Sequence, residues 1–236
     1  MTTKARALGL AFFLVGAAFG VSAQIASPNR VVSERFIGEV HPSVIPASLK
    51  VSPDGKHVAY VVAVSRGYFQ GIRRLLVVDG EKERPYDDIA EGSVIFSPDS
   101  QRVAYQAIVG SWCFMVVDGK EEKQYDGIAT EPIFSPDSRR MAYGARVGNK
   151  WFVVVDGKEE KHYDDIARGT LTFSPDSKRV AYGVKEGNKW FVVVDGNEGT
   201  QYDILRGARI VFDRPDSFHY LVLKGGEFYL VEERIE

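Results

Sequence analysis

Residues 173–182 read FSPDSKRVAY, and variants of this pattern occur at four other places in the chain. The prolines of the five copies mark the period most simply: Pro53, Pro98, Pro136, Pro175 and Pro215. A second marker, Val-Val-Asp-Gly, keeps nearly the same spacing and ends at Gly80, Gly119, Gly157 and Gly196. A third marker, Tyr-Asp, follows each of these. Three markers with one period of 38 to 45 residues indicate an internal repeat.

Each repeat has the pattern of four short β-strands. The first strand, such as 94–96, ends in Ser-Pro-Asp, where proline presets φ and aspartate suits the next position of a tight turn. The second strand follows directly, as at 102–108. The third, such as 151–155, ends in Asp-Gly, a strong hairpin signal because both residues tolerate positive φ. The fourth strand is weaker, roughly 161–166, and no stretch after residue 23 has a helical period, so no helix is expected.

The third strands are apolar on consecutive residues, which a strand needs when both of its faces are covered. A single four-stranded sheet would expose both faces, so each repeat must pack on its neighbours. Stacked four-stranded units of about 40 residues are typical of a β-propeller. We therefore expect an all-β fold, a β-propeller of four-stranded antiparallel blades. An open β-solenoid is the alternative.

The repeated FSPDSKRVAY pattern resembles the repeat of TolB-like, WD-repeat-like β-propeller proteins. The resemblance covers residues 46–236 and implies the propeller fold without implying one function. TolB members carry a separate α/β domain before the propeller, and nothing in this sequence provides one. An envelope-assembly role like that of TolB is a hypothesis that rests on this resemblance alone.

The repeat predicts five blades, at 46–90, 91–129, 130–167, 168–206 and 207–236. The fifth copy stops at Glu236 after its third strand. Residues 35–40, within the segment 24–45, fall where a fourth strand would precede the first copy. We expect this segment to complete the last blade and close a ring of five, which removes an exposed sheet edge. The alternative is a half-ring that completes itself by dimerising.

The first residues are typical of a secretory signal peptide. Lys4 and Arg6 precede the apolar stretch 8–19, and Val-Ser-Ala at 21–23 offers small residues for cleavage after Ala23. The apolar stretch is short for a membrane span, which needs about 20 residues. We expect a periplasmic or secreted protein with no membrane span after cleavage. An uncleaved anchor is the alternative.

The composition and motifs exclude several classes of protein. With 30 Lys and Arg against 32 Asp and Glu, the net charge of −2 argues against nucleic-acid binding. The one cysteine, Cys113, allows neither an internal disulfide nor a cysteine-based zinc cluster. No Gly-x-Ser-x-Gly elbow, His-Glu-x-x-His, phosphate loop or dinucleotide fingerprint occurs. We therefore predict no catalytic residue, no metal and no cofactor.

Departures from the repeat are the strongest candidates for a binding site. The first copy has an insertion between its second and third strands, and loops on a rigid scaffold often carry binding. Its aromatic and arginine side chains are types enriched at interface hot spots: Arg66, Tyr68, Phe69, Arg73 and Arg74. The matching places in later copies hold Trp151 and Trp190, and Trp112 is slightly offset from this position. These indoles either contact a sugar or partner, or pack between blades.

One aspartate follows the repeated tyrosine in each of four copies: Asp87, Asp126, Asp164 and Asp203. Equivalent positions of a ring lie on one circle, so these carboxylates are candidates for binding a cation, a sugar or a basic peptide. The structural alternative is that each accepts backbone hydrogen bonds where the chain turns to the next blade.

The preferred hypothesis is an exported, non-enzymatic propeller that binds a protein or peptide, with the bacterial cell envelope as a candidate location. A carbohydrate-binding or carbohydrate-active five-bladed propeller is the alternative. Glycoside hydrolysis would need two carboxylates about 5–10 Å apart over a cleft, and the sequence singles out no such pair.

Overall fold

The structure is a computed structural model that describes residues 33–65, 71–205 and 209–236. The chain divides into two compact units, residues 1–36 and 37–236, and all the strands described below belong to the second. The predicted all-β class is confirmed. The expectation that no helix would form is wrong at one place, the 3-10 helix η1 (Pro46–Ser48), where a proline in the first turn favours helical φ. The predicted signal peptide, 1–23, lies outside the described residues.

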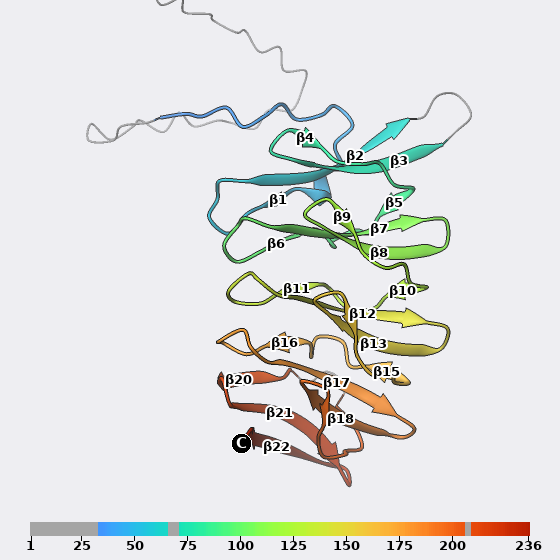
Figure 1. Ribbon diagram of the computed structural model, residues 1–236, viewed down its shortest axis with the longest axis vertical. Coiled ribbons are helices and arrows are strands. Elements are labelled where there is room, and N and C mark those ends of the chain that lie inside the picture. Colours follow the sequence, from blue (N-terminus) through green and yellow to red (C-terminus); the bar gives the residue numbers. More distant parts are fainter. Residues whose placement is uncertain (1–32, 66–70, 206–208) are drawn as a thin grey trace, which may run out of the picture. The chain divides into compact units, whose positions relative to one another are not determined.

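The strands form five antiparallel sheets that follow one another in chain order (Figure 1). Sheet one has the order β1 (Lys50–Val51), β2 (Val58–Ser65), β3 (Ile72–Val78), β4 (Glu81–Lys82). Sheet two has the order β5 (Asp88–Ile89), β7 (Val103–Val109), β8 (Trp112–Val117), β9 (Lys120–Glu121), with β6 (Ile95–Phe96) also on β7.

Sheets three and four repeat the arrangement of sheet two. Sheet three has the order β10 (Gly127–Ile128), β12 (Met141–Val147), β13 (Lys150–Val155), β14 (Lys158–Glu159), with β11 (Ile133–Phe134) also on β12. Sheet four has the order β15 (Asp165–Ile166), β17 (Val180–Glu186), β18 (Lys189–Val194), β19 (Asn197–Glu198), with β16 (Thr172–Phe173) also on β17. Sheet five contains β20 (Val211–Arg214), β21 (Ser217–Lys224) and β22 (Glu227–Arg234).

The predicted fourth strand, 161–166, is divided between two sheets. The N–H and C=O of Tyr163 bond to Trp151 at 2.7 and 2.9 Å and so belong to sheet three. The next residue, Asp164, already donates its N–H to the carbonyl of Lys185 in sheet four, at 2.9 Å. The Tyr-Asp marker is therefore the point where the chain passes from one sheet to the next. Sheets two, three and four accordingly begin at residues 88, 127 and 165, before the repeat boundaries at 91, 130 and 168.

The segment predicted to complete sheet five makes its described contacts with sheet one. A Cβ on Gly38 would lie 3.1 Å from the Cα of Gly80, and the carbonyl of Glu39 accepts a hydrogen bond from Tyr60 Oη at 3.0 Å. Among the described residues, β22 pairs with β21 alone. Ring closure by residues 35–40 stays a prediction.

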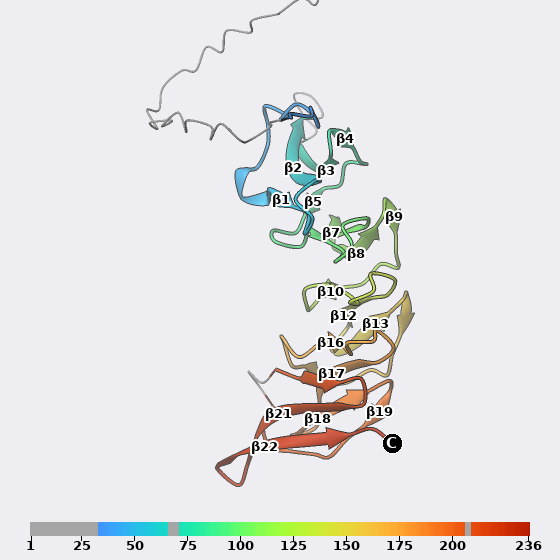
Figure 2. The ribbon, with the colours of Figure 1, turned by 90° about the vertical axis from the view of Figure 1, so that its left-hand side faces the viewer.

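Buried apolar side chains fill the space between successive sheets, whose order is also visible in Figure 2. Between sheets one and two, for example, Val61 and Leu76 pack with Tyr105, Phe114 and other buried residues. Because these strands bury side chains on both faces, their apolar runs are continuous, as expected from the sequence.

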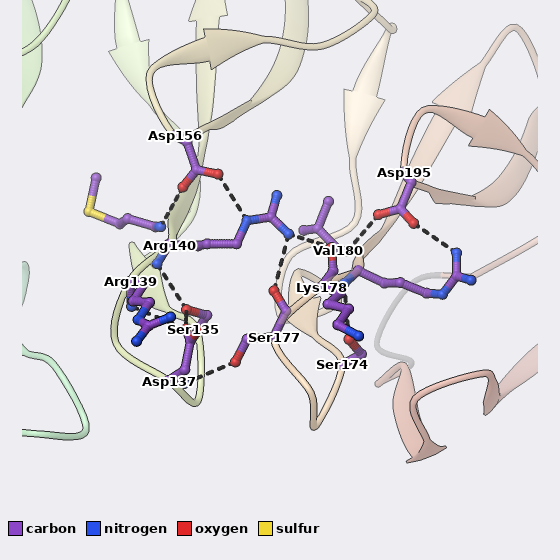
Figure 3. A network of polar contacts seen from close by, with 12 residues as sticks. Ser135, Asp137, Arg139, Arg140, Asp156, Ser174, Ser177, Lys178, Val180 and Asp195 are labelled. Atoms are coloured by element: carbon purple, nitrogen blue, oxygen red, sulfur yellow. Dashed lines mark hydrogen bonds and ion pairs between the residues drawn. The ribbon is translucent and has the colours of Figure 1, made fainter.

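One polar network ties the turns of neighbouring sheets together and accounts for two repeat markers at once (Figure 3). Asp156, of the Asp-Gly marker, accepts the N–H of Met141 through Oδ1 at 3.0 Å and Arg140 Nε through Oδ2 at 2.9 Å. Arg140 Nη1 then donates to two carbonyls of the next repeat: that of Ser177, which ends the Ser-Pro-Asp-Ser turn, at 3.2 Å, and that of Lys178, which follows the turn, at 2.5 Å. The arginine thus joins a hairpin of sheet three to a turn of sheet four.

The last serine of the Ser-Pro-Asp-Ser turn has a second role between sheets. Ser100, Ser138 and Ser177 have φ of 65° to 66°, a left-handed region that L-residues other than glycine seldom occupy. Each hydroxyl accepts the N–H of the turn aspartate in the preceding repeat, as Ser138 does from Asp99 at 3.0 Å. The first repeat has Gly55 at this position, and a glycine offers no hydroxyl to a preceding sheet.

Buried tyrosines of the second strands make a further set of inter-sheet bonds. Tyr105 Oη donates to Glu83 Oε2 of the preceding sheet at 2.6 Å, and Tyr143 Oη donates to Glu122 Oε2 at 2.7 Å. Burial, and then the bond to Glu122, raises the pKa of Tyr143 well above its ordinary value. Tyr182 occupies the same position, but its buried hydroxyl has no partner among the described residues.

Candidate functional site

The hairpin turns between the second and third strands form one repeated feature, which we call the hairpin rim. The described turns of the rim begin at Gly110, Gly148, Gly187 and Gly225. Each first glycine donates its N–H to Oδ2 of the aspartate after the repeated tyrosine. The N···O distances are 2.9 Å to Asp87, 2.6 Å to Asp126, 2.7 Å to Asp164 and 2.9 Å to Asp203. The backbone bond required by the structural alternative for these aspartates is therefore present in all four.

Three of the four aspartates also pair with a cation that stands 14 residues earlier in the chain. Lys150 Nζ lies 2.7 Å from Asp164 Oδ1, and Lys189 Nζ lies 2.7 Å from Asp203 Oδ1. Arg73 lies 3.2 Å from Asp87. The hydrogen bond from Lys150, and then that from the Gly187 N–H, holds the pKa of Asp164 below its ordinary value. In these copies the protein neutralises its own rim carboxylate.

Sheet two breaks this pattern. Trp112 stands 14 residues before Asp126, in the position that Arg73, Lys150 and Lys189 fill elsewhere. Its indole is 47 % exposed. Within the described ranges, Oδ1 of Asp126 has no hydrogen-bond or ion-pair partner. An exposed indole and an unneutralised carboxylate therefore lie opposite each other, one residue from the isolated antiparallel β-bridge between Cys113 and Tyr125.

The cation near Asp126 is engaged by other groups. Arg146 donates Nη1 to the carbonyl of Gly148 at 3.0 Å and Nη2 to the backbone carbonyl of Asp126 at 3.3 Å. Its guanidinium carbon also lies 5.3 Å from the ring centroid of Trp151. Arg146 thus stabilises the turn without forming the side-chain ion pair that Lys150 forms with Asp164.

The other two candidate tryptophans pack between sheets. Trp190 is 9 % exposed and belongs to the apolar cluster shared by sheets four and five. Trp151 is half-buried against the cluster between sheets three and four. Of the three tryptophans singled out in the sequence, Trp112 alone is exposed.

The insertion of the first copy is only partly described. Arg66, Tyr68 and Phe69 lie outside the described residues. Arg73 and Arg74 follow Ile72, the first residue of β3, and form ion pairs with Asp87 and Asp88, at 3.2 and 2.5 Å. Both arginines therefore contact the crossover between sheets one and two.

In residues 33–65, 71–205 and 209–236, no group of three or more His, Cys, Asp or Glu side chains is placed to hold a metal ion. The same residues include no helix long and apolar enough to cross a membrane.

No protein-family model and no curated protein matches the sequence. Solved structures that are similar include TolB from Acinetobacter baumannii, at 19 % identity and a TM-score of 0.42, over 79 % of this chain and 51 % of that one. The β-propeller domain of Cps50 (Swd1) from Myceliophteria thermophila is 10 % identical, with a TM-score of 0.41 over 75 % and 67 % of the two chains. The β-propeller domain of the trilobed protease from Pyrococcus furiosus is 14 % identical, with a TM-score of 0.31 over 79 % and 82 %.

The chain spans about half the length of the TolB structure that it matches. All three likenesses are to proteins that contain β-propellers, and their identities and TM-scores are too low to transfer a function. The functional proposal below therefore rests on the residues of the hairpin rim.

Proposed function

We propose that this chain is an exported, non-enzymatic scaffold of five propeller blades that binds a protein or peptide partner. The observation that carries the proposal is the unneutralised Asp126 across from the exposed Trp112, where other sheets have their own lysine or arginine. A lysine or arginine of the partner would take the place of that missing cation.

The chemistry of this position suits a basic side chain. A carboxylate accepts a charge-assisted hydrogen bond from an ammonium or guanidinium group. An indole face attracts the same cation through its quadrupole. The bond of Lys150 to Asp164, at 2.7 Å, is an internal example of the contact that the partner would make with Asp126.

This position alone does not give high affinity. An exposed ion pair contributes about 0.2–1 kcal/mol, and a cation–π contact at an exposed site contributes about 0.5–1 kcal/mol. Micromolar affinity requires about 8 kcal/mol, so the partner must contact further residues of the rim. The connection from β2 to β3, with Arg66, Tyr68 and Phe69, is the equivalent turn of sheet one and is proposed to supply part of this contact.

Residues 1–23 are proposed to direct the protein to the periplasm or beyond. A carbohydrate ligand is the second candidate, because an exposed indole such as Trp112 also stacks on sugar rings. The two candidates differ in what they require of Asp126. A basic peptide needs its negative charge, whereas an uncharged sugar needs only a hydrogen-bond acceptor.

The test is an array of peptides that differ in lysine and arginine content, probed with the purified protein alongside a glycan array. Basic peptides should be retained, and Asp126→Asn and Trp112→Ala should each weaken retention up to about 5-fold, the loss expected for a contact of at most about 1 kcal/mol. Retention on glycans but not on peptides would contradict the proposal.

Two further variants separate binding from folding. Trp112→Lys rebuilds the lysine–aspartate pair found at Lys150 and Asp164, so it should keep the fold and weaken retention of basic peptides more than Trp112→Ala does, because it removes the indole and neutralises Asp126. Lys150→Ala is the matched control, because its partner lies on a different turn of the rim. If the Trp112→Lys protein binds basic peptides as well as the original protein does, Trp112 and Asp126 are not part of the peptide-binding site.

A further inference from the structure

Apolar side chains lie on both sides of the unneutralised carboxylate of Asp126. On the sheet-two side is Trp112, which is 47 % exposed, and Val109 pairs directly with it across the hairpin. On the sheet-three side is Val147, which is 46 % exposed. The carboxylate that has no described partner on Oδ1 is therefore the charged centre of a small apolar surface. We call these four residues the Asp126 patch.

Two hydrogen bonds hold Asp126 beside Val147. The N–H of Asp126 donates to the carbonyl of Arg146 at 3.0 Å, and its carboxylate accepts the N–H of Gly148 at 2.6 Å. Arg146 and Gly148 stand immediately before and after Val147 in the chain. A partner that reaches the carboxylate of Asp126 therefore also comes close to the exposed part of Val147.

Sheets four and five have charged residues where the Asp126 patch is apolar. Val109 and Val147 each pair with the first residue of a third strand. The residue in this position is Glu186 in sheet four and Lys224 in sheet five. The missing internal cation and the apolar neighbours thus coincide at Asp126. Exposed aromatic and apolar side chains around a single charge suit an interface that takes this charge out of water.

The rim contains its own example of an arginine that contacts an indole and oxygen atoms together. Arg146 places its guanidinium carbon 5.3 Å from the ring centroid of Trp151. It also donates Nη1 to the carbonyl of Gly148 at 3.0 Å and Nη2 to the backbone carbonyl of Asp126 at 3.3 Å. A guanidinium can make both contacts because it is planar, stacks on aromatic rings and carries five donors, whereas an ammonium is a compact point charge.

We propose that the Asp126 patch recognises an arginine with an apolar residue close to it, in an extended segment of the partner protein. This inference rests on the proposed function and specifies the side chains that the partner presents. The arginine would stack on Trp112 and donate to Oδ1 of Asp126, while the apolar side chain would cover Val147. Side chains on one side of an extended chain repeat every two residues, about 7 Å apart. The apolar residue is therefore expected two positions from the arginine.

Retention of a matched set of peptides by the purified full chain tests this inference. The parent peptide carries one arginine at its centre and a leucine two positions before and two positions after it, with glycine and serine elsewhere. Lysine in place of the arginine should lower retention about 2- to 5-fold, the size of an exposed cation–π contact. Serine in place of the leucines should lower it about 5-fold, as expected for the loss of roughly 40 Å² of buried apolar area.

Variants of the protein assign each preference to its side chain. Val147→Ser should remove the preference for leucine over serine and keep that for arginine over lysine, and Trp112→Ala should remove the preference for arginine. Val51→Ser is the matched control and should keep both preferences. Val51 is also an exposed valine, 61 % exposed, but it lies on β1 and pairs with Val58, at the end of β2 away from the rim. Thermal melting shows that each variant is folded.

The outcomes separate this inference from the proposed function. Equal retention of the arginine and lysine peptides, or of the leucine and serine peptides, would overturn the inference. If retention of these peptides still falls in Asp126→Asn, the proposed function stands. Retention that does not change in Asp126→Asn would overturn the proposed function and the inference together. Equal effects of Val147→Ser and Val51→Ser would place the apolar contact outside the Asp126 patch and so overturn the inference.

Discussion

Replacing Arg140 by alanine tests whether the polar network between turns holds neighbouring sheets together. Arg140 pairs with Asp156 in its own sheet and donates to two carbonyls, of Ser177 and Lys178, in the next repeat. Arg179 is the matched control. It pairs with Asp195 at 3.1 Å, has a similar partial exposure, and has no described hydrogen bond to the following repeat.

The difference between the two variants isolates the inter-sheet contacts. A hydrogen bond from a charged donor contributes about 1.5–3 kcal/mol, and about 1 kcal/mol is reasonable for each of the two bonds of this partly exposed guanidinium. The cation–π contact of Arg140 with Phe173, at 5.2 Å, adds about 0.5 kcal/mol. The intra-sheet ion pairs, about 0.2–1 kcal/mol each, cancel in the comparison. We therefore expect Arg140→Ala to lower the free energy of unfolding by about 2.5 kcal/mol more than Arg179→Ala.

Urea unfolding followed by circular dichroism measures this difference, and thermal melting should show a Tm about 5–10 °C lower for Arg140→Ala than for Arg179→Ala. Equal destabilisation by the two variants would refute the idea that Arg140 joins sheets three and four. It would mean that apolar packing and the serine–aspartate and tyrosine–glutamate bonds hold the sheets together without the arginine.

Three further predictions concern single groups. Tyr143→Phe should lower the free energy of unfolding by about 1 kcal/mol, because it removes a bond to Glu122, whereas Tyr182→Phe, whose hydroxyl has no described partner, should be neutral or stabilising in the same urea assay. Ser138→Gly should lower the free energy of unfolding, because it removes the hydroxyl that accepts the Asp99 N–H, although glycine adopts the positive φ of this position without strain. Ser138→Ala should lower the free energy of unfolding further, because alanine also lacks the hydroxyl and stays strained at positive φ. Two variants as stable as the original would contradict this. Hydrogen bonds from the Ser135 hydroxyl, and then from the Arg139 N–H, hold the pKa of Asp137 in the folded protein below its ordinary value. The ionised Asp137 therefore stabilises the folded protein fully at pH values above its pKa in the unfolded chain, and this stabilisation is lost as the pH falls through its pKa in the folded protein. Acid titration of Asp137→Asn should therefore show a smaller loss of stability below about pH 4 than the original.

The sequence was sufficient to predict the sheets but not the sheet to which every residue belongs. Turn chemistry and the spacing of the prolines predict strand pairs such as β12 and β13, because these signals are local. The fourth strand was misplaced because Tyr163 and Asp164 are adjacent in sequence but bond to different sheets. The apolar or polar character of these two residues does not show that the chain passes from sheet three to sheet four between them.

At the hairpin rim too, the sequence revealed the repeated residues but not their bonding partners in other sheets. The repeated aspartates were recognised, but their acceptor role depends on a glycine about 22 residues away in the next sheet. The offset of Trp112 from Trp151 and Trp190 is visible in the sequence, but its consequence, that the Trp112 side chain points to the opposite face of its strand, was not predicted. Spacing held the missing signal: a lysine or arginine precedes the aspartate by 14 residues in three copies, and Trp112 replaces it in the fourth.

The most direct measurement of the proposed binding site follows the indole N–H signals of the three tryptophans by NMR during titration with an arginine-containing peptide retained on the array. The signal of Trp112, assigned by its loss in Trp112→Lys, should shift with peptide concentration, while those of the packed Trp151 and Trp190 stay in place. A titration that saturates without moving the Trp112 signal would contradict the account.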